Sequence, residues 1–108
     1  MTLRTDASRA VPVGRGVWDT AILSGGSEPR GKITFRLYGP DDSGCAGPPV
    51  FTVEQVVIGN GRYRSATFVP QQAGSYLWIA TYSGDANNAP AATRCGDPEE
   101  TSRCRGGC

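Results

Sequence analysis

The segment that decides the fold class is Ala73-Gly74-Ser75-Tyr76-Leu77-Trp78-Ile79-Ala80-Thr81-Tyr82-Ser83-Gly84-Asp85. It follows a turn, is rich in aromatic and β-branched residues, and ends at a Ser-Gly-Asp turn, which predicts a β-strand. Alternation gives one face four mostly aromatic side chains: Tyr76, Trp78, Ala80 and Tyr82. The other face carries three smaller side chains: Leu77, Ile79 and Thr81. Because both faces are largely apolar, we expect a central strand that is covered on both sides.

The length and charge of the chain restrict its class. Its 108 residues suffice for one domain with a modest core. The 11 basic and 10 acidic residues leave a net charge of +1, which gives no electrostatic case for a nucleic acid or an anionic membrane as partner. The chain has no His, the commonest general base and metal ligand. No segment is long and apolar enough to enter a bilayer. We therefore expect a protein that is not an enzyme and holds no cofactor.

The pattern of turns predicts an all-β fold. Fifteen Gly and eight Pro residues, with no helical periodicity, indicate strands joined by tight turns. The predicted strands are 18–24, 32–38, 50–58, 62–69 and 76–82. Gly59-Asn60-Gly61 separates the third strand from the fourth, so we expect these two to form a hairpin. Five or six such strands predict a β-sandwich. Alternation assigns these side chains to its core: Leu23, Ile33, Phe35, Leu37, Phe68, Tyr76, Trp78 and Ala80.

The four cysteines indicate an oxidising compartment. Cys45, Cys95, Cys104 and Cys108 lie in loop-rich segments, and an even number in a small domain suggests disulfides, with three connectivities open. A zinc site is less favoured, because three residues separate Cys104 from Cys108 and the other two cysteines form no second knuckle. The N-terminus lacks the apolar region of a signal peptide. We therefore expect an extracellular or cell-surface domain that has been excised from a longer protein.

Several phrases of the sequence together resemble one family. They are Asp19-Thr20-Ala21-Ile22-Leu23-Ser24-Gly25-Gly26, Gly31-Lys32-Ile33-Thr34-Phe35-Arg36-Leu37-Tyr38-Gly39-Pro40, Gly59-Asn60-Gly61, Ala73-Gly74-Ser75-Tyr76 and Tyr82-Ser83-Gly84-Asp85-Ala86-Asn87-Asn88. In this order they resemble the bacterial immunoglobulin-like repeat domains of large secreted and surface-anchored proteins, particularly the actinobacterial type. The resemblance covers residues 11–100.

The resemblance implies an immunoglobulin-like, Greek-key β-sandwich that serves as a spacer or display module and has no catalytic activity. It divides the chain into a domain at 1–100 and a Cys/Gly/Arg tail at 101–108. Tyr76, two residues after Gly74, is similar to the tyrosine corner of strand F in such sandwiches. Cys45 and Cys95 match two family cysteines, which implies a disulfide between them. The loops after strands C and F lie at opposite ends of a simple sandwich, so this pairing requires one loop to fold along the sheet, or the chain after Pro90 to run back.

The tail departs from the family pattern. Where the family continues into its last strand, G, residues 101–108 offer Arg, Gly and Cys without apolar alternation. The final strand is therefore expected to be missing or atypical. If it is missing, the strand 76–82 has an open edge, and Leu77, Ile79 and Tyr38 form an interface for self-association or for a donated strand. Cys104 and Cys108 would then lock that contact. The competing interpretation is that residues 89–94 already close the edge.

Two further candidate sites have simpler explanations. Asp85, Asn87 and Asn88, with Asp41 or Asp42, offer oxygen ligands to Ca²⁺, although Asp and Asn also form turns by bonding their own backbone. Lys32 would be needed for an intramolecular isopeptide bond, but it alternates with core residues and is expected to be solvated.

Two functional classes remain open. The first is a non-enzymatic structural or display module whose partners are neighbouring domains or further copies of the chain. The second is an adhesion module in which the loop at 85–88, with or without Ca²⁺, contacts a glycan or a protein.

Overall fold

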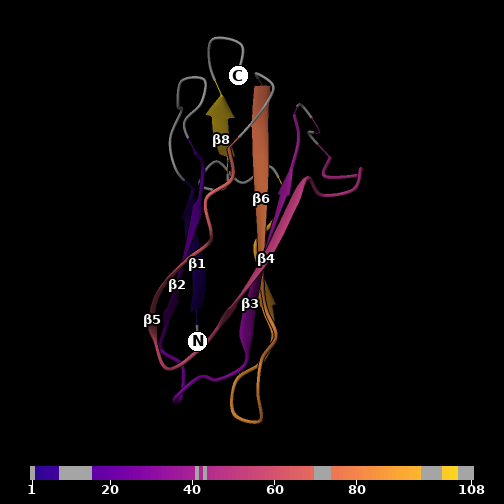
Figure 1. The fold of residues 1–108 in the computed structure, drawn as a ribbon. Helices are drawn as coiled ribbons and strands as arrows, with labels where there is room; N and C mark the ends of the chain where they lie inside the picture. The colour runs from indigo at the N-terminus through magenta and orange to yellow at the C-terminus, as the bar shows by residue number, and fades with distance from the viewer. Residues whose placement is uncertain are drawn as a thin grey trace.

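The protein is a sandwich of two antiparallel sheets with no helix in the described residues. The computed structural model describes residues 2–7, 16–40, 42, 44–69, 74–95 and 101–104. Its strands are β1 (Thr2–Ala7), β2 (Asp19–Ser24), β3 (Lys32–Tyr38), β4 (Phe51–Val56), β5 (Gly61–Arg64), β6 (Gly74–Tyr82), β7 (Ala91–Ala92) and β8 (Thr101–Cys104). Figure 1 shows the two layers, with β1, β2 and β5 in one and the remaining strands in the other. The predicted all-β sandwich is confirmed.

The smaller sheet has the strand order β1-β2-β5. Its central strand, β2, alternates strictly: Asp19, Ala21 and Leu23 are buried, while the residues between them are half-buried on the outer face. This alternation is expected for an antiparallel sheet that packs on a core with one face only.

The larger sheet has the order β4-β3-β6, and both β7 and β8 pair with the far side of β6. The register places Leu37 opposite Trp78 and Phe35 opposite Ala80. β6 therefore has a partner on each side over most of its length. The prediction that it is a central strand is confirmed.

The core lies between the sheets and is centred on Trp78, which is fully buried. Its indole makes edge-to-face contacts with Phe35 and Phe51, at centroid distances of 6.4 and 6.3 Å. The predicted core is confirmed for seven side chains that are at most 2% exposed: Leu23, Ile33, Phe35, Leu37, Tyr76, Trp78 and Ala80. Phe68 is half-buried and packs against this cluster. The corner before Tyr76, at 70–73, lies outside the described residues.

The predicted hairpin around Gly59-Asn60-Gly61 is wrong. β4 pairs with β3 and β5 pairs with β2, so the chain passes from one sheet to the other at this turn. The hydroxyl of Tyr63 holds the corner: it accepts the Ile58 N–H at 2.9 Å and donates to the Gly59 carbonyl at 2.7 Å. Glycines that allow positive φ serve a corner as well as a hairpin, so the turn residues alone do not select the partner strand.

The final strand is atypical, because it is present in two pieces. β8 pairs with the first half of β6, where Cys104 lies opposite Gly74 and Thr101 opposite Leu77. β7 pairs with the other end, at Thr81 and Tyr82. Of the two alternatives for the final strand, missing or atypical, the structure thus shows the second, since Thr101–Cys104 form β8. Pairing with β6 requires backbone groups and not apolar side chains, so the polar composition of this segment did not prevent it.

Candidate functional site

The loop between β6 and β7 is organised by the carboxylate of Asp85. Its Oδ2 accepts the backbone N–H of Arg30 at 2.6 Å, and its Oδ1 accepts that of Asn87 at 2.8 Å. The side-chain amide of Asn88 donates to both oxygens, at 3.0 and 3.2 Å. These donors, the Arg30 N–H foremost, stabilise the charged form and lower the pKa of Asp85 to about 2.

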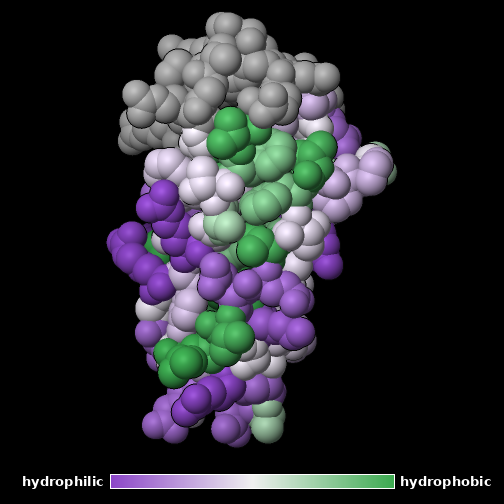
Figure 2. Space-filling view, viewed as in Figure 1, coloured by the Kyte–Doolittle hydropathy of each residue, from purple (hydrophilic) through white to green (hydrophobic). Residues whose placement is uncertain are grey.

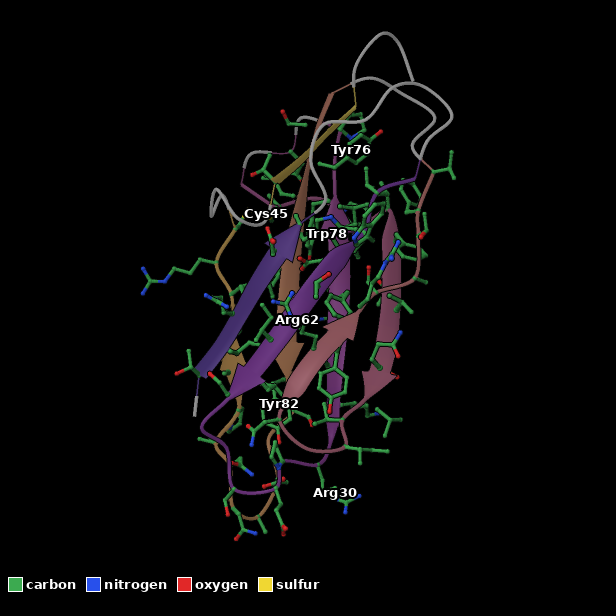
Figure 3. All side chains as sticks on the ribbon, turned by 90° about the vertical axis from the view of Figure 1, so that its left-hand side faces the viewer. Arg30, Cys45, Arg62, Tyr76, Trp78 and Tyr82 are labelled. Carbon is green, nitrogen blue, oxygen red and sulfur yellow. A yellow bond between two sulfur atoms is a disulfide. The ribbon has the colours of Figure 1, made fainter. Side chains whose placement is uncertain are left out.

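Two neighbouring side chains extend this network to the loop between β2 and β3. The buried hydroxyl of Tyr82 donates to the Arg30 carbonyl. Burial and the nearby Asp85 carboxylate raise the pKa of this hydroxyl. Asn88 accepts the Ser27 N–H at 3.0 Å and donates to the Ser27 carbonyl at 3.1 Å. Tyr82 and Arg30 lie at the same end of the sandwich in Figure 3, where the network ties the two loops together.

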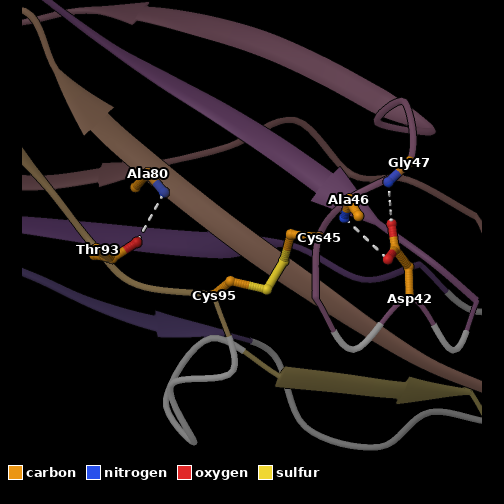
Figure 4. Close-up of a disulfide and its surroundings, with 7 residues drawn as sticks. All are labelled: Asp42, Cys45, Ala46, Gly47, Ala80, Thr93 and Cys95. Atoms are coloured by element: carbon orange, nitrogen blue, oxygen red, sulfur yellow. Dashed lines mark hydrogen bonds between the residues drawn. A yellow bond between two sulfur atoms is a disulfide. The ribbon is translucent and has the colours of Figure 1, made fainter.

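The geometry argues against the calcium site considered from the sequence. Ca²⁺ takes six to eight oxygen ligands, but both carboxylate oxygens of Asp85 already face N–H donors. Asp42, one proposed companion, caps its own loop by accepting the N–H groups of Ala46 and Gly47 (Figure 4). It follows the far end of β3 from the Asp85 loop, and Asp41 lies outside the described residues. In the described part of the chain, no three side chains of His, Cys, Asp or Glu are grouped so that they could hold a metal ion.

The disulfide between Cys45 and Cys95 is formed as predicted, with a Cα–Cα distance of 6.1 Å. The geometric objection is removed because the chain after Pro90 runs back along β6. Thr93 continues this course. Its N–H donates to the Ala80 carbonyl at 3.0 Å, and its hydroxyl accepts the Ala80 N–H, also at 3.0 Å (Figure 4). Cys95 thereby reaches the level at which β3 ends.

The disulfide consequently spans β6, since Cys45 follows β3 on one side of that strand and Cys95 follows β7 on the other. The inner face of β6 is filled by Trp78 and Ala80, so the bridge crosses the outer face. Cys104 is the last residue of β8, whereas Cys108 lies outside the described residues. A disulfide role for these two cysteines stays a prediction, with their connectivity open.

The predicted apolar interface is largely covered. Tyr38 and Leu77 are cross-strand neighbours on the outer face of the larger sheet. Leu77 is only 7% exposed, and Ile79 and Tyr38 are half-buried. The expectation of an open edge beside them is wrong, because β8 pairs with β6 at Leu77 and Thr93 bonds Ala80. At these positions β6 already has a partner, so a strand donated by another chain cannot pair with it there.

Lys32 is a surface residue, as expected from its place in the alternation. Its Nζ lies 3.6 Å from Glu54 Oε2, and both side chains are more than half exposed. Such an ion pair contributes ~0–1 kcal/mol to stability. The solvated interpretation of Lys32 is confirmed, and an isopeptide bond has no support.

A cluster of arginines on the outer face of the smaller sheet is the feature that the sequence analysis missed. The register aligns Arg4 and Arg62 on either side of Ile22. In the neighbouring part of the face, the Arg64 guanidinium lies 4.1 Å from the ring centroid of Trp18, within the range of a cation–π interaction. The spacing of Arg62 and Arg64 indicated one shared face, but nothing in the sequence identified β1 as their neighbour across β2.

Comparisons of this chain with protein-family models, with curated proteins and with solved structures find no match. Within the described residues, no helix has the length and hydropathy needed to cross a membrane.

Proposed function

We propose that this chain is a non-enzymatic extracellular structural module that spaces or displays neighbouring domains of a larger bacterial surface or fibre protein. The observation that carries the proposal is the path of the chain through an elongated body of 45 × 24 × 19 Å. β1 begins opposite Ser24, at the end of the sandwich that holds the Asp85 network. β8 ends opposite Gly74, at the other end (Figure 1). Modules that are entered at one end and left at the other extend a chain when they are joined in series.

The strand order supports an immunoglobulin-like topology. Taking β1, β2 and β5 as strands A, B and E gives one sheet of the immunoglobulin arrangement. β4, β3 and β6, with the pair β7 and β8, then correspond to C′, C, F and a divided G. We infer on this ground that the sandwich is of the immunoglobulin type, in agreement with the resemblance to bacterial repeat domains.

The disulfide supports an extracellular location and a load-bearing role. Disulfides persist in oxidising compartments. The bond joins the segments that flank β6 and encloses a sequence separation of 50 residues. Those residues cannot extend when the chain is pulled from its ends.

Small-angle X-ray scattering on tandem repeats of this chain tests the spacer proposal. One, two and three copies, joined directly, should show a maximum dimension that grows by roughly the 45 Å long axis with each copy. A particle that grows in mass but not in length would contradict the proposal.

A second candidate is the adhesion module. A cavity of about 260 Å³ beside the Asp85 loop favours it, with Gly25, Ser27 and Asn87 among the residues that line it. Neutral oligosaccharides titrated into the labelled protein should then shift the backbone resonances of these residues. Shifts elsewhere only, or none, would count against this candidate.

A further inference from the structure

The outer face of the smaller sheet carries a cationic side chain on each of its two outer strands, on either side of an apolar residue of the central strand. Arg4 on β1, Ile22 on β2 and Arg62 on β5 are direct cross-strand partners and point away from the core. Adjacent strands lie ~4.8 Å apart, which places the two arginine backbones about 10 Å from each other. Figure 3 looks onto this face and shows Arg62 at its middle.

Neither guanidinium group has an anionic partner in the part of the chain that the structure describes. Among the described residues, neither Arg4 nor Arg62 makes an ion pair or a side-chain hydrogen bond, and both are exposed. Between them, over Ile22, lies a shallow cavity of about 200 Å³, which Thr5 and Asp6 also line. A guanidinium presents a planar fork of N–H donors that matches a carboxylate in two parallel bonds. The site thus offers two such forks on a rigid surface, with an apolar floor between them.

The next row of cross-strand neighbours adds one acidic and one basic side chain, so the face stays positively charged. Asp6, Thr20 and Arg64 are aligned on β1, β2 and β5, and Arg64 is held over Trp18. Three arginines and one aspartate give this face a charge of +2, which exceeds the +1 of the whole chain. This side of the molecule, at the left of Figure 2, carries a cluster of hydrophilic side chains.

We propose that this face, defined by Arg4, Ile22 and Arg62, binds an acidic polysaccharide through the carboxylates of uronic acid units. A polymer laid across the three strands would place successive carboxylates on the two arginines, while the ring between them covers Ile22. Arg64, held over the ring of Trp18, extends the cationic surface into the next row. The site is separate from the cavity beside the Asp85 loop.

Three observations favour a polysaccharide over a nucleic acid. Single-stranded nucleic acids bind by stacking bases on aromatic rings, and Trp18, the aromatic residue beside these rows, already has a guanidinium over its ring. A net charge of +1 also provides no long-range attraction for a duplex. The extracellular location proposed above, which the disulfide favours, is one where acidic glycans are available as polyanions.

The test measures binding of polygalacturonate to the whole chain at low and physiological salt, by calorimetry or biolayer interferometry. Fully methyl-esterified polygalacturonate has the same backbone without the charges and serves as the control ligand. The wild type should bind the acid form only. Arg4→Ala/Arg62→Ala should weaken binding by about tenfold or more, because both charge-assisted contacts are lost.

The matched control variant is Arg36→Ala/Arg94→Ala, which removes the same charge from the larger sheet and the segment after β7. It should bind within about twofold of the wild type, which separates a site from general charge. Arg4→Lys/Arg62→Lys keeps the charge but loses the forks, and its affinity should fall between those of the wild type and the alanine variant. Unchanged thermal midpoints would show that all variants fold.

Three results would overturn the proposal. The first is no binding of polygalacturonate at low salt. The second is equal weakening by the matched control variant. The third is duplex or single-stranded DNA that binds as tightly as polygalacturonate and depends equally on Arg4 and Arg62, which would assign the face to nucleic acid instead.

Discussion

Removal of the Cys45–Cys95 disulfide should cost the protein a large part of its stability. The bond closes a loop with a sequence separation of 50 residues. Loop-entropy scaling converts this length into a stabilisation of about 4 kcal/mol, through restriction of the unfolded chain. A small domain is stable by only ~5–15 kcal/mol in total. Cys45→Ser/Cys95→Ser should therefore unfold at a much lower denaturant concentration, although the sheets themselves keep their pairing.

The assay is equilibrium unfolding in guanidinium chloride, followed by tryptophan fluorescence. The protein with the disulfide and the Cys45→Ser/Cys95→Ser variant should both carry Cys104→Ser and Cys108→Ser, so that the other cysteines contribute nothing to the difference in stability. The unfolding free energy of the disulfide-free protein should be lower by about 4 kcal/mol, and a reductant should lower the oxidised protein to the same value. A difference below ~1 kcal/mol would refute the argument from loop closure, as would no response of the oxidised protein to reductant.

Four further predictions follow from the core, the loop network and the disulfide. Trp78→Ala should lower the unfolding free energy by ~3–5 kcal/mol, the cost of emptying a large buried aromatic site. Trp18→Ala changes a half-buried residue and should lower the unfolding free energy clearly less. Equal losses would mean that Trp78 is not the centre of the core. The pKa of Asp85 is lowered to about 2 from 3.8, so its contribution to stability is present above pH 4 and is lost as the pH falls towards 2. Urea titrations across this range should show a shallower acid loss for Asp85→Asn, and identical pH profiles would disprove the role of the network. Millimolar Ca²⁺ should leave the thermal midpoint unchanged, because an ion stabilises the fold only if it binds the native state; a rise of several degrees that Asp85→Asn abolishes would restore the calcium hypothesis. In single-molecule pulling, reduction of the disulfide should lengthen the released chain by about 170 Å, the length that the sequence separation of 50 corresponds to at ~3.4 Å per residue.

The sequence determined the core well because alternation is local. Ile33, Phe35 and Leu37 repeat with period two within one strand, and Trp78 does the same in another, so the buried faces followed without knowledge of the partners. The pairing of strands was harder, since it depends on residues distant in sequence. The turn at Gly59-Asn60-Gly61 was compatible with a hairpin and with a corner, and only the pairing of β4 with β3 distinguishes them.

The candidate sites also divide into features that a local stretch of sequence indicates and features that depend on residues distant in sequence. Local composition indicates the loop that holds Asp85, Asn87 and Asn88. The N–H groups that bond the Asp85 carboxylate come from within this loop and from Arg30, and the contact with Arg30 depends on the fold. The sequence indicates residues 89–94 as one alternative for the last strand, but it does not indicate the division of that strand into β7 and β8. Arg4 and Arg62 are far apart in the chain and meet through the register of two strand pairs, which no local pattern contains.

The pairing of β7 and β8 with β6 should close the sandwich, so that the chain folds as a self-contained module. Hydrogen exchange measured by nuclear magnetic resonance tests this claim at the amides on that side of β6. The Ala80 N–H points to this side, because it donates to Thr93. Since backbone N–H groups alternate along a strand, those of Tyr76 and Tyr82 point to the same side, towards β8 and β7. We predict that these three amides are protected equally at high and low protein concentration. Fast exchange in dilute solution, with protection that grows as copies associate, would mean that the edge is open and is completed only by a second chain.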